Sequence, residues 1–129
     1  MRRIFLLTIL AVMSRAEDWR LTSDVHFVKL FEDFEPKQLS IAGVRTASIR
    51  TKNVFNDGQY GIRTYFFRIS KEGCEWSVKE ETWYNSDGKI AKSSTIEDSK
   101  LTWTPFLESN REIDKSMAER AIRFLNSHQ

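Results

Sequence analysis

The sequence has one cysteine, two prolines and two histidines in 129 residues. The low counts of cysteine and histidine argue against proteins that depend on internal disulfides or on bound metal ions. The single cysteine, Cys74, cannot form an internal disulfide, and it has no partner at the spacing of a zinc site. Neither His26 nor His128 has a second histidine nearby that would suit a metal ion. We therefore expect no metal and no cofactor.

The motifs of phosphate-binding loops and nucleophile elbows are also missing. Gly58 and Gly61 stand close together, but they precede a predicted strand, whereas phosphate-binding loops open helices. A thiol dyad of Cys74 with His26 would need a lowered thiol pKa, and the neighbouring Glu75 opposes one. The sequence favours a structural role for both residues.

Two pairs of adjacent carboxylates are the remaining candidates for acid–base chemistry. Glu80 and Glu81 lie on a predicted strand, where neighbours point to opposite faces. Glu97 and Asp98 lie in a predicted turn that is open to water. Neither pair suits general acid–base catalysis, so we predict a protein that is not an enzyme and name no catalytic residue.

The N-terminus has the pattern of a secretory signal peptide. Arg2 and Arg3 precede an apolar run over residues 4–13. Ser14-Arg15-Ala16 then has the small-x-small pattern of a signal-peptide cleavage site. The run is about half the length that a membrane span needs. We therefore predict a signal peptide over residues 1–16 and no membrane span; a buried N-terminal strand or helix is the alternative.

Cleavage after Ala16 would leave residues 17–129 as one domain with one core. Residues 1–16 contain three arginines and no acidic residue, so cleavage lowers the net charge from +2 to −1. This balance gives no electrostatic reason to expect a nucleic-acid partner. Export without a disulfide framework favours a bacterial periplasm, a cell surface or secretion.

Evenly spaced glycines organise the middle of the chain. Gly43, Gly58, Gly73 and Gly88 are fifteen residues apart, and the last three close turn-like triplets such as Asn56-Asp57-Gly58. Glycine adopts a positive φ without steric cost, and a preceding Asn or Asp favours a turn. The segments between them are rich in β-branched and aromatic residues, which indicates antiparallel hairpins.

These patterns predict the class α+β, mainly β, with a curved antiparallel β-meander of about six strands. Pro36 and its acidic neighbours predict a loop over residues 32–37. Weak alternation places residues 44–55 near an edge, whereas aromatic residues on both faces place residues 60–70 in the centre. The principal strands are expected over 19–22, 25–31, 44–55, 60–70, 74–84 and 89–96, with short ones over 39–41 and 101–103.

Strict alternation in residues 74–84 places Cys74, Trp76 and Val78 on one face, with Glu75 and Glu81 on the other. The same alternation would turn Trp83 outward. A β-bulge around residues 79–81 would return Trp83 to the Trp76 side, and we expect one there because strands of this length usually need a bulge to curl.

A C-terminal amphipathic helix is expected to pack on the sheet. Ser109 and Glu112 have the spacing of a capping box at its start. Its apolar stripe consists of Ile113, Met117, Ala121, Phe124 and Leu125. Its solvent-facing side, which we call the wet side, consists of Lys115, Glu119, Arg120 and Arg123.

Four tryptophans and nine phenylalanines are many for a chain of this size. Most of these rings are expected in the core. Trp83 and Tyr84, next to the predicted turn at Asp87-Gly88, are also candidates for a surface anchor that binds a partner protein.

The order of these motifs resembles the bacterial surface-adhesin protein E family of small exported proteins. The resemblance covers residues 19–125, and its motifs are a strand led by Trp19, the Tyr65-to-Ile69 strand followed by Cys74, the Ser86-to-Ile90 turn, and Trp103-x-Pro105. The resemblance implies an antiparallel sheet with a packed C-terminal helix. It also implies adhesion, since the name-giving member binds host extracellular proteins, although most relatives have no assigned role.

One feature departs from the family pattern. Many relatives pair the strand cysteine with a cysteine in the final helix, and this helix contains none. The resemblance therefore implies an unpaired Cys74, and it transfers no catalytic residue.

The sequence thus predicts an exported envelope protein of binding or adhesin type that recognises a host or envelope protein, as a monomer or homodimer. It does not identify the partner or the binding residues. One alternative is a small ligand-binding domain or nuclear-transport-factor-like enzyme with a pocket under the helix. Another is an inhibitor of a secreted enzyme, for which residues 32–37 are the only candidate loop.

Overall fold

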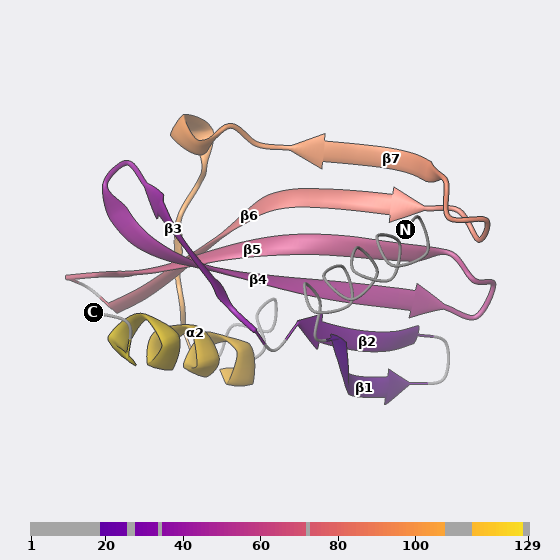
Figure 1. Ribbon diagram of the computed structural model, residues 1–129, viewed down its shortest axis with the longest axis horizontal. Coiled ribbons are helices and arrows are strands. Elements are labelled where there is room, and N and C mark those ends of the chain that lie inside the picture. The colour runs from indigo at the N-terminus through magenta and orange to yellow at the C-terminus, as the bar shows by residue number, and fades with distance from the viewer. Residues whose placement is uncertain (1–18, 26–27, 34, 72, 108–114, 128–129) are drawn as a thin grey trace, which may run out of the picture.

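The computed structural model describes residues 19–25, 28–33, 35–71, 73–107 and 115–127. An eight-stranded antiparallel sheet carries one helix at its C-terminal end (Figure 1). The predicted class, α+β and mainly β, is confirmed, with eight strands in place of about six. In chain order the elements are β1 (Trp19–Val25), β2 (Val28–Asp33), β3 (Lys37–Ile41), β4 (Val44–Phe55), β5 (Tyr60–Ser70), β6 (Gly73–Tyr84), β7 (Ile90–Thr95), the short 3-10 helix η1 (Asp98–Lys100), β8 (Thr104–Pro105) and α2 (Lys115–Ser127).

The strands follow the order β1-β2-β4-β5-β6-β7, with β3 added to β4 and β8 added to β6. β2 pairs with the second half of β4, and β3 pairs with its first half. The prediction that residues 44–55 lie near an edge is therefore wrong. The polar side chains that suggested an edge are accommodated inside the sheet; Thr46 and Thr51 are buried, and Arg50 forms an ion pair with Asp33.

The predicted exposed loop over residues 32–37 is also wrong. β2 extends to Asp33 and β3 begins at Lys37, so only a short break around Pro36 separates them. The side chains of Glu32 and Asp33 are 1% and 3% exposed. Acidic residues usually indicate solvent, but each of these has an arginine partner, Arg120 for Glu32 and Arg50 for Asp33.

The glycine-based turns form as predicted. Gly58 and Gly88 have φ values of 89° and 87°, which favour glycine. In each turn the preceding aspartate accepts a hydrogen bond from the amide that follows the glycine, at 2.9 Å for both Asp57 and Asp87. Both hairpins are therefore closed by the same local hydrogen bond. The two turns fix the registers of β4 with β5 and of β6 with β7.

The bulge expected in β6 is present at Lys79. Val78 lies opposite Tyr65 and Glu80 lies opposite Thr64, so Lys79 has no counterpart on β5. The extra residue returns Trp83 to the face that carries Trp76 and Val78. It also places Glu81 on that face, which corrects the expectation from strict alternation.

The helix α2 packs on β4 and β5 (Figure 1), so we call this side of the sheet the helix side. Its residues Met117, Ala118, Ala121 and Leu125 are buried, which confirms the predicted stripe over the described part of the helix. Ile113 and the predicted capping box at Ser109 and Glu112 lie outside the described residues. The buried core consists of Ala47, Ile49, Tyr65, Phe67, Trp76, Met117, Ala118, Ala121 and Leu125.

Arg120 was expected on the wet side of the helix, and this expectation is wrong. Its side chain is 12% exposed, and its Nη2 lies 3.3 Å from Glu32 Oε2.

The last strand lies further along the chain than predicted, since β8 comprises Thr104–Pro105 and not residues 101–103. Pro105 pairs with Glu75, and the Phe106 amide donates to the Cys74 carbonyl at 2.8 Å.

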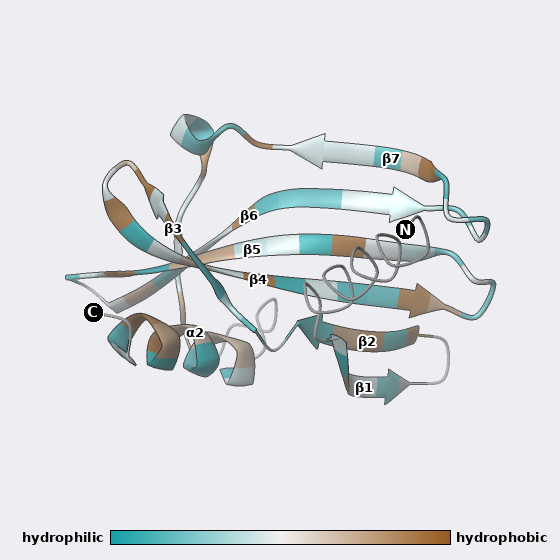
Figure 2. Cartoon of the chain, in the orientation of Figure 1, coloured by the Kyte–Doolittle hydropathy of each residue, from teal (hydrophilic) through white to brown (hydrophobic). Residues whose placement is uncertain are grey.

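The central strand is correctly predicted. β5 pairs with β4 on one side and β6 on the other, and Phe66 and Phe67 are buried on its two faces. Figure 2 shows hydrophilic colours along the middle of β6, beyond the part of the sheet that the helix covers. Among the described helices, none has the length and apolar character that crossing a membrane requires.

Candidate functional site

The thiol that the sequence singled out lies at the margin of the core. Cys74 is half-buried, packs against the core cluster and forms no disulfide. Burial, together with the charge of Glu75, raises the pKa of its thiol to about 11. A thiolate is therefore strongly disfavoured at neutral pH. His26, the other member of the dyad considered above, lies outside the described residues, as does His128.

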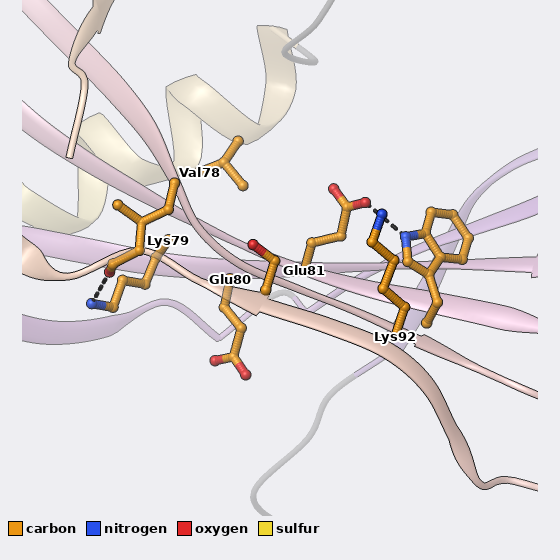
Figure 3. A pocket seen from close by; sticks show the side chains of 8 residues that line it. Val78, Lys79, Glu80, Glu81 and Lys92 are labelled. Carbon is orange, nitrogen blue, oxygen red and sulfur yellow. Dashed lines mark hydrogen bonds between the residues drawn. The ribbon is translucent and has the colours of Figure 1, made fainter. Parts of the chain in front are cut away.

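The adjacent carboxylates are separated as the sequence indicated. Glu80 is exposed, and its carboxylate points away from that of Glu81 (Figure 3). Asp98 pairs with Lys79 at 2.6 Å, and Glu97 lies 3.6 Å from Lys100. Within the described ranges, no three His, Cys, Asp or Glu side chains gather closely enough to hold a metal ion.

The two candidate anchor residues face opposite sides of the sheet. Tyr84 stacks on Tyr60, with ring centroids 4.6 Å apart and an interplanar angle of 12°. Trp83 lies on the helix side, opposite Gly61 in the β5–β6 register. Both residues are half-buried, but they cannot act as one anchor because successive side chains of a strand point in opposite directions.

Trp83 belongs to a network that also contains Arg63, Glu81 and Tyr65. Glu81 accepts hydrogen bonds from Trp83 Nε1 at 2.7 Å and from Arg63 Nε at 2.8 Å. Arg63 Nη2 lies 2.6 Å from Glu81 Oε2, and Arg63 Nη1 lies 3.1 Å from the Tyr65 hydroxyl. One carboxylate thus holds an arginine and a tryptophan in fixed positions on the sheet.

A glycine makes room for the tryptophan. A β-carbon at Gly61 would lie 2.6 Å from two atoms of the six-membered ring of Trp83, so the ring occupies the space of the missing side chain. The Phe55 ring adjoins it, with centroids 5.9 Å apart. Glycine inside a strand often marks such a close approach.

The network shifts the ionisation of both charged partners in the direction that keeps them ionised. Burial raises the pKa of the Glu81 carboxyl, but hydrogen bonds from Trp83 and Arg63, with the charges of Arg63 and Lys92, outweigh burial and lower that pKa. Burial likewise lowers the pKa of Arg63, and its contacts with Tyr65 and Glu81 outweigh burial and raise it. These directions are typical of an ion pair, and they oppose general-acid catalysis by Glu81, which would need a raised carboxyl pKa.

Three adjoining hollows follow the helix side of the sheet, and we call them together the helix-side groove. The first, which we call the Trp83 hollow, measures about 300 Å³ (Figure 3). The second and third measure about 160 Å³ and 220 Å³, and both are lined by Arg63 and Tyr65. The Trp83 hollow is lined by Val78, Lys79, Glu80, Glu81, Trp83, Lys92, Ser94 and Ile96, the second by Arg63, Tyr65, Trp76 and Val78, and the third by Leu30, Glu32, Thr51, Asn53, Arg63, Tyr65 and Met117.

Sequence reasoning located Trp83 but missed Arg63, Gly61 and Lys92. Gly61 enters the sequence analysis only where a phosphate-binding loop is rejected, although a glycine inside an aromatic strand can indicate a ring packed over it. Arg63 lies opposite Glu81, and Lys92 lies opposite Trp83, only through the registers of β6 with its two neighbours. The bulge at Lys79 decides the first of these pairings.

No family model, curated protein or solved structure matches this chain. The resemblance to the surface-adhesin protein E family over residues 19–125 therefore stays a prediction.

Proposed function

We propose that this protein is an exported, non-catalytic binding domain of the bacterial envelope that recognises a host or envelope protein through the helix-side groove. One observation carries the proposal. The helix α2 packs on β4 and β5, while large side chains of β6 and β7 line a groove on the same side of the sheet. The signal peptide predicted over residues 1–16 supports the location.

The residue types in the groove are those that contribute most to protein interfaces. Tryptophan, tyrosine and arginine are enriched among hot-spot residues. Arg63 and Glu81 keep 40% and 31% of their side-chain surface exposed although they are bonded to each other. Because Trp83 and Arg63 are already held by Glu81, a partner would lose little affinity to ordering them.

The ionisation of the candidate groups favours binding over catalysis. A nucleophilic cysteine needs a lowered pKa, and that of Cys74 is raised to about 11. A catalytic acid needs a raised carboxyl pKa, and that of Glu81 is lowered. The first shift opposes nucleophilic catalysis by Cys74, and the second opposes general-acid catalysis by Glu81.

The structure offers less support to the two alternative functions. Between α2 and the sheet, buried side chains such as Ala121, Leu125 and Phe67 fill the space where a ligand under the helix would bind. A separate hollow of about 390 Å³ lies at the C-terminal end of the helix, lined by residues that include Val44, Ile69 and Leu125, but no tryptophan or tyrosine lines it. An inhibitor would need an exposed loop, but Glu32 and Asp33 in the candidate segment are buried.

The test exchanges the charges of one ion pair and uses a second pair as a matched control. Arg63 with Glu81 and Arg68 with Glu75 are both β5–β6 pairs, on opposite faces of the sheet. The double variants Arg63→Glu/Glu81→Arg and Arg68→Glu/Glu75→Arg retain both charges of each pair but reverse their positions. Both variants must remain folded by circular dichroism before they are compared.

The mature chain would be immobilised and exposed to purified fibronectin, laminin, vitronectin and collagen, and to recombinant envelope proteins of the expressing bacterium. We expect saturable binding to at least one of them, weakened at least about tenfold by the Arg63/Glu81 exchange and unchanged by the Arg68/Glu75 exchange. Equal losses in both variants, or no saturable binding in any arm, would overturn the proposal.

A further inference from the structure

The orientation of the Trp83 ring is set by the protein and does not depend on a ligand. The ring lies over Gly61, adjoins Phe55, and donates its only N–H to Glu81 at 2.7 Å. A tryptophan that served only as core filler would be buried, whereas Trp83 is half-buried and lines the largest of the three hollows of the groove. The protein thus presents an aromatic surface of fixed position to whatever enters.

The Trp83 hollow has an apolar part and a polar rim. Trp83, Val78 and Ile96 supply the apolar part, and Ile96 is 38% exposed. Glu81, Lys92 and Ser94 supply a carboxylate, an ammonium group and a hydroxyl. Each oxygen of a carboxylate has more than one lone-pair site, so Glu81 can accept further hydrogen bonds besides those from Trp83 and Arg63.

The mixture of charges on this rim restricts the ligand. An anionic ligand would meet Glu81, and a cationic ligand would meet Lys92, while the charge of Lys92 already acts on Glu81. A neutral ligand with several hydroxyl groups meets neither difficulty, because a hydroxyl donates to a carboxylate and accepts from an ammonium group. A pyranose ring has such hydroxyls around its edge and an apolar C–H face that can lie on an aromatic ring.

We propose that the Trp83 hollow is a saccharide-binding subsite that takes a neutral pyranose, with the C–H face of the sugar on Trp83 and its hydroxyls on Glu81, Lys92 and Ser94. Its volume of about 300 Å³ is at the lower end of the range for ligand pockets, which suits one or two sugar rings. This subsite does not depend on the protein partner proposed above, although it occupies one end of the same groove.

The test follows the indole N–H resonances of the four tryptophans by two-dimensional NMR while a disaccharide is added. The probes are chitobiose, lactose and maltose, and the Trp83 signal is assigned by its loss in Trp83→Phe. We expect at least one probe to shift the Trp83 signal saturably with a dissociation constant of about 1 mM, as suits a small neutral ligand. A non-glycosylated pentapeptide of Ser, Thr and Asn serves as the control for general polar contacts.

Gly61→Ala provides the sharpest variant, because it removes no polar group but places a β-carbon where the Trp83 ring lies. We expect it to weaken binding at least about tenfold. Glu81→Gln is the second variant if Gly61→Ala does not fold, with an expected loss of at least about threefold. Trp103→Phe, which alters a ring over Arg68 elsewhere on the sheet, should leave binding unchanged.

Three results would overturn the subsite: no saturable shift at about 50 mM of any disaccharide, an equal response to the peptide, or equal affinity in Trp83→Ala, measured there by backbone amide shifts. None of them bears on the binding of the non-glycosylated recombinant envelope proteins, so the two proposals fail separately.

Discussion

Replacing Arg120 with methionine should destabilise the protein strongly, because it would remove an arginine that pairs with a buried carboxylate. Arg120 Nη2 lies 3.3 Å from Glu32 Oε2, and the two side chains are 12% and 1% exposed. Removal of one partner from a buried ion pair costs about 3–5 kcal/mol. The cost arises from the charge left behind on a side chain that is only 1% exposed.

This loss is large compared with the stability of the whole domain. Proteins of this size are stable by about 5–15 kcal/mol, and each kcal/mol lost lowers the melting temperature by about 4 °C. We therefore expect Arg120→Met to lower the melting temperature by about 12–20 °C. The pair joins β2 to α2, so the loss should also loosen the helix.

The assay is urea unfolding of the mature chain, followed by tryptophan fluorescence, for Arg120→Met, Glu32→Met and the double variant. The double variant should be within about 1 kcal/mol of wild type, since two apolar side chains can replace a buried ion pair without loss. Glu119→Gln is the matched control on the same helix, where Glu119 is 49% exposed and lies 4.0 Å from Lys115. It should change stability by less than about 0.5 kcal/mol.

Two results would refute this reasoning. A loss below about 1 kcal/mol in Arg120→Met would mean that the Glu32 carboxylate is stabilised without Arg120. A double variant as unstable as the sum of the single variants would mean that the two side chains contribute independently, through packing and not through their charges.

Three further predictions concern pH, the thiol and export. Because its contacts lower the pKa of Glu81, the stability that this carboxylate contributes is present above the unfolded-state pKa of about 4.3 and is lost as the pH falls through the lower folded-state value. Urea unfolding at several pH values should therefore show a smaller loss between about pH 5 and pH 3 in Glu81→Gln than in wild type, and equal losses would contradict this. At pH 8 the Cys74 thiol, with its pKa of about 11, should react with a disulfide reagent at least about tenfold more slowly than in urea, and equal rates would contradict its burial. Intact mass of protein from a periplasmic fraction should correspond to a chain beginning at Glu17; an uncleaved cytosolic chain would remove the envelope role.

Local features of this fold could be predicted because the residues that produce them are close in the sequence. The turns at Gly58 and Gly88 depend on a positive φ and on the aspartate one position earlier. The bulge at Lys79 could be located because alternation fails between Val78 and Trp83. The helix stripe follows from a period that the sequence shows directly.

Features that depend on distant partners could not be predicted in this way. The polar residues of β4 suggested an edge, but two separate strands, β2 and β3, cover one side of it in succession. Glu32 and Asp33 suggested a loop because their partners, Arg120 and Arg50, lie on other elements. A charged side chain and its counterion can be far apart in the sequence, so local composition does not show whether the charge is buried.

The helix-side groove likewise combines features that could be predicted from the sequence with features that could not. Sequence alone predicted a strand that carries Trp83, a bulge that returns this ring to the face of Trp76, and hairpins marked by evenly spaced glycines. It could not establish that Gly61 lies beneath the ring, that Glu81 joins Arg63 to Trp83, or that α2 leaves β6 and β7 to line a groove. These arrangements depend on the registers of three strands and on the position of the helix across them. Register and packing are set by the burial of the whole core, which no single segment of the sequence determines.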